Sequence, residues 1–451
     1  MTEPIINNLI DLLLKSFKSL EVNVPLIDIE NIAVFIYRSM ENGKRIFHTT
    51  RHVFLVCDSD DPIQILAGLY HDVIYYQIDG GLPPHTEFLK SFLQIEQRKF
   101  RIRSNPPDEL SFKLCCDVFN LSPGQQIQLN NGLNEFLSAV IAVKNLSKFL
   151  SLKYLAEIAA CIEGTIPFRS KDKNGKSSFD LLEERLINLN EKYDLGFSSE
   201  SIEKTILKAV QLANRDVENF AFSDTGKFLD NTWSLLPESN AILLKTKLYS
   251  VKSYRKALKK METFLANLDY RNIFHQYHSY PDDRDYNKMS NQARINIEIA
   301  KNYLRVKLLT LAIIESLAML SGGDAPINMF LGDLNTGNPH QYKAKDFLPS
   351  VKQARQENNP QVQNLLEKGR NQDTFFDIKN SPISSYVYQT LGKANVEKYY
   401  QYAVDLFNHN LSYRKFVEII DDKVIKDISK ACAKVACTRR DALAQFFDEE
   451  K

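Results

Sequence analysis

The chain has 451 residues, a length that predicts two or three structural units or one large helical domain with an appendage. Apolar residues make up 44% and charged residues 25% of it, which is typical of a globular protein with a sizeable core. The net charge of +1 gives no long-range field that would attract a polyanion, so a nucleic-acid partner is not expected.

The cysteines and the N-terminus indicate the cellular compartment in which we expect the protein. The six cysteines contain no CxxC pair, and this favours reduced, mostly buried thiols over a disulfide framework. The opening stretch MTEPIINNLIDLLLKSF lacks the basic start of a signal peptide, and Asn and Asp interrupt its apolar run. No stretch reaches the roughly 18–20 unbroken apolar residues that cross a bilayer. We therefore expect a soluble, cytoplasmic protein without a membrane segment.

Helical periodicity dominates the chain from its start. Apolar residues at three- and four-residue steps make one stripe over residues 5–17. Pro25 begins a second helix, residues 46–57 are predicted to form a third, and 63–77 a fourth that is strongly apolar. The alternation typical of strands is absent, and Gly and Pro number only 16 each. The sequence therefore predicts an all-α fold.

Polar stretches rich in turn-forming residues interrupt the helices. The predicted loops of the first half are 79–84, 103–109, 122–132 and 171–180. Helical periodicity resumes at 181, residues 321–340 are the longest later interruption, and 353–364 are polar enough to be a linker or surface arm.

Three histidines and an aspartate lie close together in this apolar region, although the chain has only eight histidines. His48 and His52 are four residues apart, a spacing that places both on one face of a helix. His71 and Asp72 are adjacent in LAGLYHDVIYY, where a buried carboxylate needs a partner. Imidazole and carboxylate groups suit Zn, Fe, Mn, Ni or Co, so this pattern favours a metal site over ordinary packing.

The stretch RIFHTTRHV followed by LAGLYHDVIY resembles the HD superfamily of metal-dependent phosphohydrolases. It is closest to members that begin with a YHxxxH motif, although Phe47 stands here where Tyr is usual. The resemblance covers roughly residues 30–220 and implies an HD-domain helical bundle with inserted loops, followed by a helical C-terminal region. We therefore divide the chain into a hydrolase domain at 1–235 and a region of unknown role at 236–451.

The resemblance also implies roles for the site residues. His52, His71 and Asp72 match the metal ligands of the family, and His48 would be the general acid or a phosphate contact. The family needs a final aspartate on a later helix. Asp216 in LANRDVENFA is the better candidate for it, because Asp180 lies in a stretch expected to be exposed.

The implied cofactor is a divalent ion, one of Mn, Mg, Zn, Fe, Ni or Co. Such an ion lowers the pKa of bound water and polarises a phosphoryl oxygen, while a protonated His48 would donate to the leaving oxygen. Asp72 would belong to the catalytic set and could bridge to a second ion. Only His85 lies between Asp72 and Asp216, which argues against the di-iron oxygenase branch, because that branch uses additional histidines.

Further residues near these motifs could contact a phosphate, each with a structural alternative. Arg169 could clamp it with two hydrogen bonds or could terminate a helix, and Thr165 precedes it in the same segment. Arg45 and Arg51 flank the histidines but could be solvated helix charges. His85 could line the rim of the pocket.

The predicted substrate is a small-molecule phosphoester, with a nucleotide or cyclic nucleotide favoured by analogy with the family alone. Three alternatives stay open: a metal-binding but non-catalytic scaffold or ligand-binding protein, an iron oxygenase using the same ligands, and a nucleic-acid-associated protein using the basic residues of 245–260. The basic stretch fits a solvated helix face better. A homo-oligomer also stays open.

Overall fold

The structure is a computed structural model, and it describes residues 4–96, 99–129, 131–245, 248–332, 342–351 and 357–447. The chain divides into two compact units. The first comprises Met1–Phe220 and Asp269–Asn291, and the second Ala221–Leu268 and Gln292–Lys451. These units describe compactness only, so the division into functional domains at residue 235 stays a prediction.

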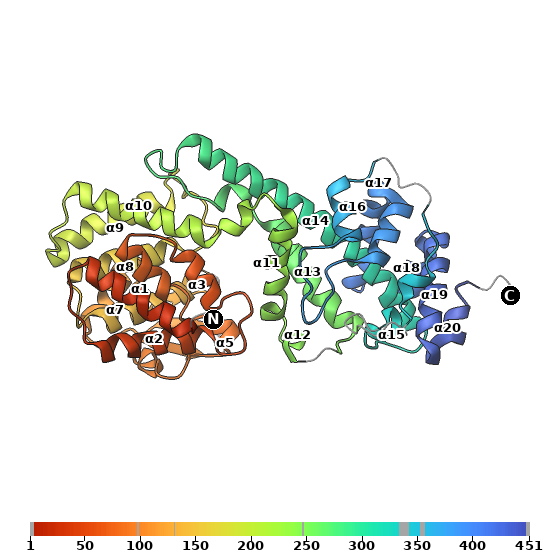
Figure 1. Cartoon of the computed structure of the whole chain (residues 1–451), viewed down its shortest axis with the longest axis horizontal. Coiled ribbons are helices and arrows are strands. Elements are labelled where there is room, and N and C mark those ends of the chain that lie inside the picture. Colours follow the sequence, from red (N-terminus) through yellow and green to blue (C-terminus); the bar gives the residue numbers. More distant parts are fainter. Residues whose placement is uncertain are drawn as a thin grey trace. The chain divides into compact units, whose positions relative to one another are not determined.

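The prediction of an all-α fold is confirmed (Figure 1). The described residues form twenty α-helices and one small sheet, in which β1 (Leu93–Glu96), β2 (Lys99–Ile102) and β3 (Gln126–Ile127) are antiparallel in the order β1-β2-β3. The register pairs Leu93 with Ile102 and Phe100 with Ile127. Strands this short leave almost no alternating pattern in a sequence, which is why the sheet was not predicted. No helix in the described part of the chain is long and apolar enough to cross a membrane.

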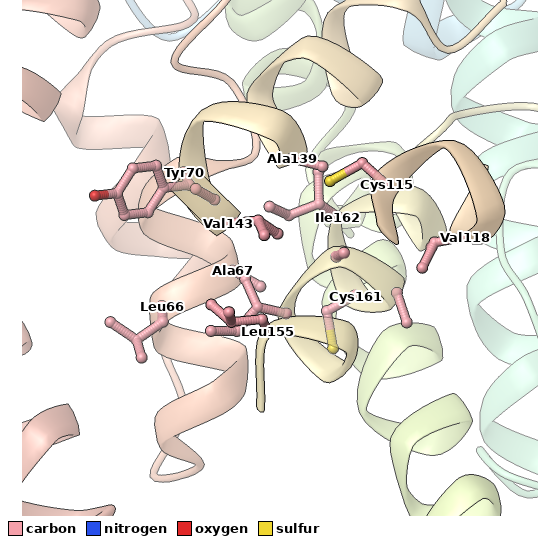
Figure 2. Packing of buried hydrophobic residues seen from close by; sticks show 14 of the residues in the cluster. Leu66, Ala67, Tyr70, Cys115, Val118, Ala139, Val143, Leu155, Cys161 and Ile162 are labelled. Carbon is pink, nitrogen blue, oxygen red and sulfur yellow. The ribbon is translucent and has the colours of Figure 1, made fainter. Parts of the chain in front are cut away.

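The helices of the first unit are α1 (Ile5–Ser19), α2 (Leu26–Met40), α3 (Thr50–Val56), α4 (Pro62–Tyr70), α5 (Tyr76–Asp79), α6 (Leu110–Val118), α7 (Leu133–Leu146), α8 (Leu152–Gly164), α9 (Ser178–Tyr193) and α10 (Ser199–Asp216). Helix α8 lies in the middle of the core, with α4, α7 and α10 packed against it. Figure 2 shows side chains of α4, α6, α7 and α8 meeting in one apolar cluster. Removing apolar surface from water stabilises the folded chain by about 25 cal/mol per Å². The helices are therefore held firmly against one another, and their ends keep fixed positions.

Two helices are shorter than the sequence predicts, and both differences affect the histidines. The third helix begins at Thr50 and not at residue 46, because the backbone N–H and the hydroxyl of Thr50 both donate to the Glu41 carboxylate. His48 therefore lies before the helix, and the prediction that it shares a helical face with His52 was wrong. The fourth helix ends at Tyr70, so His71 and Asp72 lie in the turn that follows it.

The helices of the second unit are α11 (Thr225–Ser239), α12 (Ile242–Lys245), α13 (Val251–Asn267), α15 (Asn328–Leu331), α16 (Pro360–Glu367), α17 (Pro382–Phe407), α18 (Tyr413–Ile419), α19 (Asp422–Val435) and α20 (Arg440–Ala444). Residues 283–291 of α14 (Asp283–Leu320) belong to the first unit and the rest of that helix to the second. Short 3-10 helices are Glu87–Ser91, Glu218–Ala221, Tyr270–Asn272, Ala344–Phe347 and Cys437–Arg439.

The basic stretch 245–260 does not form a uniform solvated face. On α13, Arg255 is buried and pairs with Glu315, while Lys259 pairs with Glu262 of its own helix. Parts of two predicted connections, 333–341 and 352–356, lie outside the described residues.

Candidate metal centre

Three helices bring the predicted metal ligands together. His52 lies on α3, His71 and Asp72 directly follow α4, and Asp216 is the last residue of α10. These helices pack on one another closely because of Gly68 on α4, where an added Cβ would lie 2.9 Å from the Sγ of Cys57. The sequence folds this way locally because α4 begins firmly, at Pro62 after a capping aspartate, and presents an almost wholly apolar surface to its neighbours.

The ligand atoms of His52, His71 and Asp72 all lie within 4.8 Å of one another. The two histidines are buried, and Nε2 of His71 is 3.2 Å from Oδ2 of Asp72. Asp216 is not part of that cluster, yet its Oδ1 lies 3.0 Å from Nε2 of His52 and 3.5 Å from Nε2 of His71. Two imidazole nitrogens therefore face two carboxylates, a donor set that suits a divalent transition metal.

The hydrogen bonding of the two imidazoles fits a metal site. Nδ1 of His71 lies 2.7 Å from the Gly68 carbonyl oxygen, and because a carbonyl only accepts, that nitrogen carries the proton in the neutral ring. Its Nε2 is then a lone-pair donor facing the carboxylates, as is usual for histidines that bind metals. Nε2 of His52 and of His71 are buried and make no hydrogen bond, although carboxylate oxygens lie within 3.0–3.5 Å of them. Buried polar atoms are rarely left this way, and a bound cation would satisfy both.

The two carboxylates and one imidazole have shifted pKa values. Burial alone would raise the pKa of Asp72, but the positive charges of His71, His48 and His52 outweigh it and hold that pKa well below its usual range. Burial also raises the pKa of Asp216, but the nearby imidazoles of His52 and His71 outweigh this effect and lower that pKa. Burial lowers the pKa of His71, but Asp72 and Asp216 together raise it well above its usual value. The two carboxylates therefore stay ionised and stabilise a positive charge placed between them.

Arg45 holds the backbone of Asp72 in place through its side chain. Its guanidinium is fully buried and holds the Asp79 carboxylate with two contacts, from Nε to Oδ1 at 2.9 Å and from Nη2 to Oδ2 at 2.6 Å. Its Nη1 donates to the backbone carbonyl of Asp72 at 2.6 Å, and Asp79 accepts from the backbone N–H of Tyr75. These contacts fix the turn that carries Asp72. The predicted phosphate contact of Arg45 stays a prediction, and the observed partners give it a positioning role.

His48 lies beside the cluster although it is not on α3. Its ring centroid is 5.8 Å from that of His52 and 4.6 Å from that of Tyr75, both edge to face. It is half-buried, and its charge acts on the Asp72 carboxylate. This placement fits the predicted general acid, because the ring reaches both the ligands and solvent.

Glu135, in the first turn of α7, is a candidate that sequence reasoning missed. Burial, together with the negative charges of Asp72 and Asp216, raises its pKa to about 7, against the opposing charge of Arg169. A carboxyl group with that pKa, on which the charges of Asp72 and Asp216 act, can exchange protons near neutral pH. The sequence holds only a weak signal for it, a lone acidic residue following the turn glycine Gly132 in NGLNEFL.

Arg169 and Thr165 lie in the segment after α8. Arg169 holds the buried Glu163 carboxylate with two contacts, at 2.6 and 3.1 Å, and Arg185 holds the same carboxylate at 2.7 Å. A surface pocket is lined by both arginines and by Ser178, and the Nε atoms of both arginines and the Ser178 hydroxyl are buried without a hydrogen-bond partner. Two cations on one carboxylate leave one positive charge, which suits an anion. The Thr165 hydroxyl instead donates to the Ile162 carbonyl in the last turn of α8.

Two predicted contacts lie on the surface. Arg51 is exposed on α3. His85 is exposed, has a left-handed φ of 70°, and lines a surface hollow with Asp28 and Lys144. That hollow shares no residue with the metal cluster, so a substrate role for His85 stays a prediction without a geometric argument.

Comparisons with protein-family models, with curated proteins and with solved structures find no match to this chain.

Proposed function

We propose that this protein is an HD-type metal-dependent phosphohydrolase that acts on a phosphoester through metal-activated water. One observation carries the proposal: the buried Nε2 atoms of His52 and His71, which make no hydrogen bond, lie 3.0 and 3.2 Å from carboxylate oxygens of Asp216 and Asp72. His52, His71, Asp72 and Asp216 would hold a divalent ion, which is Mn, Mg, Zn, Fe, Ni or Co. Such an ion supplies a Lewis acid and lowers the pKa of a bound water.

The residues around the ligands support proton transfer and anion binding. His48 is half-buried beside His52 and can donate a proton to a leaving oxygen. Glu135, with a pKa of about 7, can accept a proton from an attacking water. Arg169 and Arg185 carry one positive charge more than Glu163 neutralises, and this surplus can hold a phosphate.

The substrate class within this proposal is a nucleotide or cyclic nucleotide, and it rests on the resemblance of the two histidine motifs. A cytoplasmic location also belongs to the proposal and is supported by six cysteines that form no disulfide.

The first experiment measures metal content by elemental analysis in protein purified without added metal or chelator. The wild type is expected to carry about one or two transition ions per chain, and His71→Ala to carry none. His85→Ala is the matched control, because it removes an exposed histidine outside the cluster and should keep the metal. A wild type that holds none of the six ions, and takes up none when they are supplied, would refute the proposal.

The second experiment tests turnover with the metal-loaded protein. A panel of p-nitrophenyl phosphate, bis(p-nitrophenyl) phosphate, nucleoside monophosphates and cyclic nucleotides separates monoesterase from diesterase activity. Hydrolysis that is lost in His71→Ala and retained in His85→Ala supports the proposal. A full complement of metal with no hydrolysis of any ester would favour the non-catalytic metal-binding alternative instead.

A further inference from the structure

A surface pocket of the first compact unit has the charge and the hydrogen-bond donors of a phosphate site. Its volume is about 450 Å³, which is enough for a phosphate group and part of the molecule that carries it. Arg169, Arg185 and Ser178 contribute to its wall, and none of the described residues that line it is acidic. None of them is a proposed metal ligand either, so the pocket is a separate place for an anion.

The two arginines have more donors than the protein around them uses. Each guanidinium carries five N–H donors. Arg169 directs two hydrogen bonds to the Glu163 carboxylate and one to the Glu163 carbonyl, and Arg185 directs one to the same carboxylate. Their other N–H groups have no acceptor among the described residues, and the Nε atom of each is buried in that state. Such donors are costly to leave unpaired, and phosphate oxygens match the geometry of a guanidinium.

Glu163 neutralises only one of the two arginines. Its side chain is 1% exposed, whereas the side chains of Arg169 and Arg185 are each 19% exposed. Within the described part of the chain, neither arginine pairs with a second acid. One positive charge is therefore left over at a place that a ligand can reach.

The start of α9 adds partial positive charge to the same pocket. Its first residue, Ser178, lines the pocket. The N–H of Asp180 is taken by the Ser177 hydroxyl at 3.1 Å, which leaves the N–H groups of Ser178 and Phe179 without a partner inside the helix. The Asp180 carboxylate accepts the N–H of Ser177 at 2.7 Å and is not part of the pocket wall. The helix start therefore favours an anion beside the arginines.

The side chain of Ser178 points independently to a ligand. This residue is 7% exposed, and its hydroxyl is buried without a hydrogen-bond partner although it belongs to the wall of the pocket. Buried hydroxyl groups in proteins are nearly always paired. An anion drawn to the arginines would supply the missing acceptor.

We propose that the pocket of Arg169, Arg185 and Ser178 binds a phosphate group that is not hydrolysed. The binding itself needs no metal, and its part in turnover rests on the proposed hydrolase. The phosphate is either a second phosphate of the substrate or a free phosphate that acts on the enzyme. Both present the same chemistry to the pocket, and the experiments below separate them.

The first test titrates the full-length protein with inorganic phosphate by calorimetry at constant ionic strength. Phosphate is expected to bind with a dissociation constant below about 1 mM. It should bind equally well to His71→Ala, because the pocket contains no metal ligand. Binding that disappears together with the metal would place the phosphate at the metal and overturn the inference. A metal-free wild type that still binds phosphate would refute the proposed hydrolase and support the pocket.

Two variants locate the site. Arg185→Gln is expected to weaken phosphate at least about tenfold while elemental analysis shows unchanged metal, and Arg169 still neutralises Glu163 in this variant. Ser178→Ala removes an unpartnered hydroxyl, so it should fold like the wild type and weaken phosphate by about two- to tenfold. The matched control is Lys173→Gln, which removes an exposed charge outside the pocket and should change the affinity less than about twofold.

Steady-state kinetics identifies the source of the phosphate. If the substrate brings it, a nucleoside bisphosphate should show a KM at least about tenfold below that of the matching monophosphate, and Arg185→Gln should abolish the difference. If the phosphate is free, adding it should change the rate of the wild type and not that of Arg185→Gln. Absence of phosphate binding in the wild type, or unchanged binding in both Arg185→Gln and Ser178→Ala, would overturn the inference.

Discussion

Replacing Gly68 by alanine tests the packing that places the metal ligands. The added Cβ would lie 2.9 Å from the Sγ of Cys57 and 3.5 Å from side-chain carbons of Val56 and Leu212. Non-bonded carbons are optimally about 3.5–4.0 Å apart, so only the contact with Cys57 is too close. That sulfur has little room to move, since Cys57 is buried and its Sγ lies 3.5 Å from the Ile65 carbonyl.

The magnitude follows from two opposing effects. Alanine in place of glycine inside a helix favours folding by about 1 kcal/mol, whereas overpacking of a filled core costs about 1–3 kcal/mol. Gly68→Ala should therefore lower the free energy of unfolding by about 0–2 kcal/mol. The larger effect is expected on metal affinity. A shift between α3 and α4 moves His52 relative to His71, and displaced supporting contacts typically weaken a metal site about 10–100-fold.

A double-mutant cycle isolates the cause. Cys57→Ala removes the clashing sulfur, so Gly68→Ala should be neutral or stabilising in that background, with a coupling of about 1–3 kcal/mol. Denaturant unfolding measures stability, and titration of chelator-treated protein with Co²⁺ measures affinity. A single variant that binds Co²⁺ like the wild type, or a coupling below about 0.5 kcal/mol, would refute the reasoning.

Three further substitutions test the surroundings of the centre. Arg45→Met leaves the Asp79 carboxylate, 5% exposed, without its ion-pair partner, and should lower the free energy of unfolding by about 3–5 kcal/mol in denaturant titration. Glu135→Gln should reduce kcat for ester hydrolysis at least about 100-fold while elemental analysis shows unchanged metal, and an equal loss of metal would instead indicate a ligand. Burial is the main reason that the pKa of His275 is lowered to about 4 in the folded chain. In the unfolded chain a histidine has a pKa near 6.5, so between about pH 6.5 and pH 4 the unfolded chain binds a proton that the native chain does not bind. Stability should therefore fall by about 3 kcal/mol as the pH falls from about 6.5 to about 4, and His275→Gln should flatten that part of the stability curve.

The helices and the clustering of the ligands could be predicted because their signals are local. Helical spacing of apolar residues identifies the core-facing stripes, and Leu9, Leu13 and Phe17 are indeed buried on α1. His71 and Asp72 are adjacent in the sequence, so they stay close together wherever the helix before them ends. The prediction that both contribute to one site therefore does not depend on the predicted end of that helix.

The remaining features depend on contacts between distant residues. The residues next to Arg45 in the sequence do not indicate that its guanidinium will be buried in an ion pair with Asp79, which lies 34 residues later. The start of α3 is set by Glu41, nine residues before Thr50, so the helical spacing of His48 and His52 was misleading. Glu135 was missed because its pKa is raised only in the folded chain, by burial and by the charges of Asp72 and Asp216.

The ligands are held in place mainly through backbone groups, and this makes the centre sensitive to residues that never touch a metal. The Gly68 carbonyl orients the His71 ring, and Arg45 holds the carbonyl of Asp72. Arg215, the residue before Asp216, donates to the Val56 carbonyl at the end of α3. Each of these contacts joins a ligand-bearing segment to another element, so the separation of the imidazoles and carboxylates is determined by the helix packing. A substitution that loosens this packing should therefore weaken metal binding before it unfolds the chain.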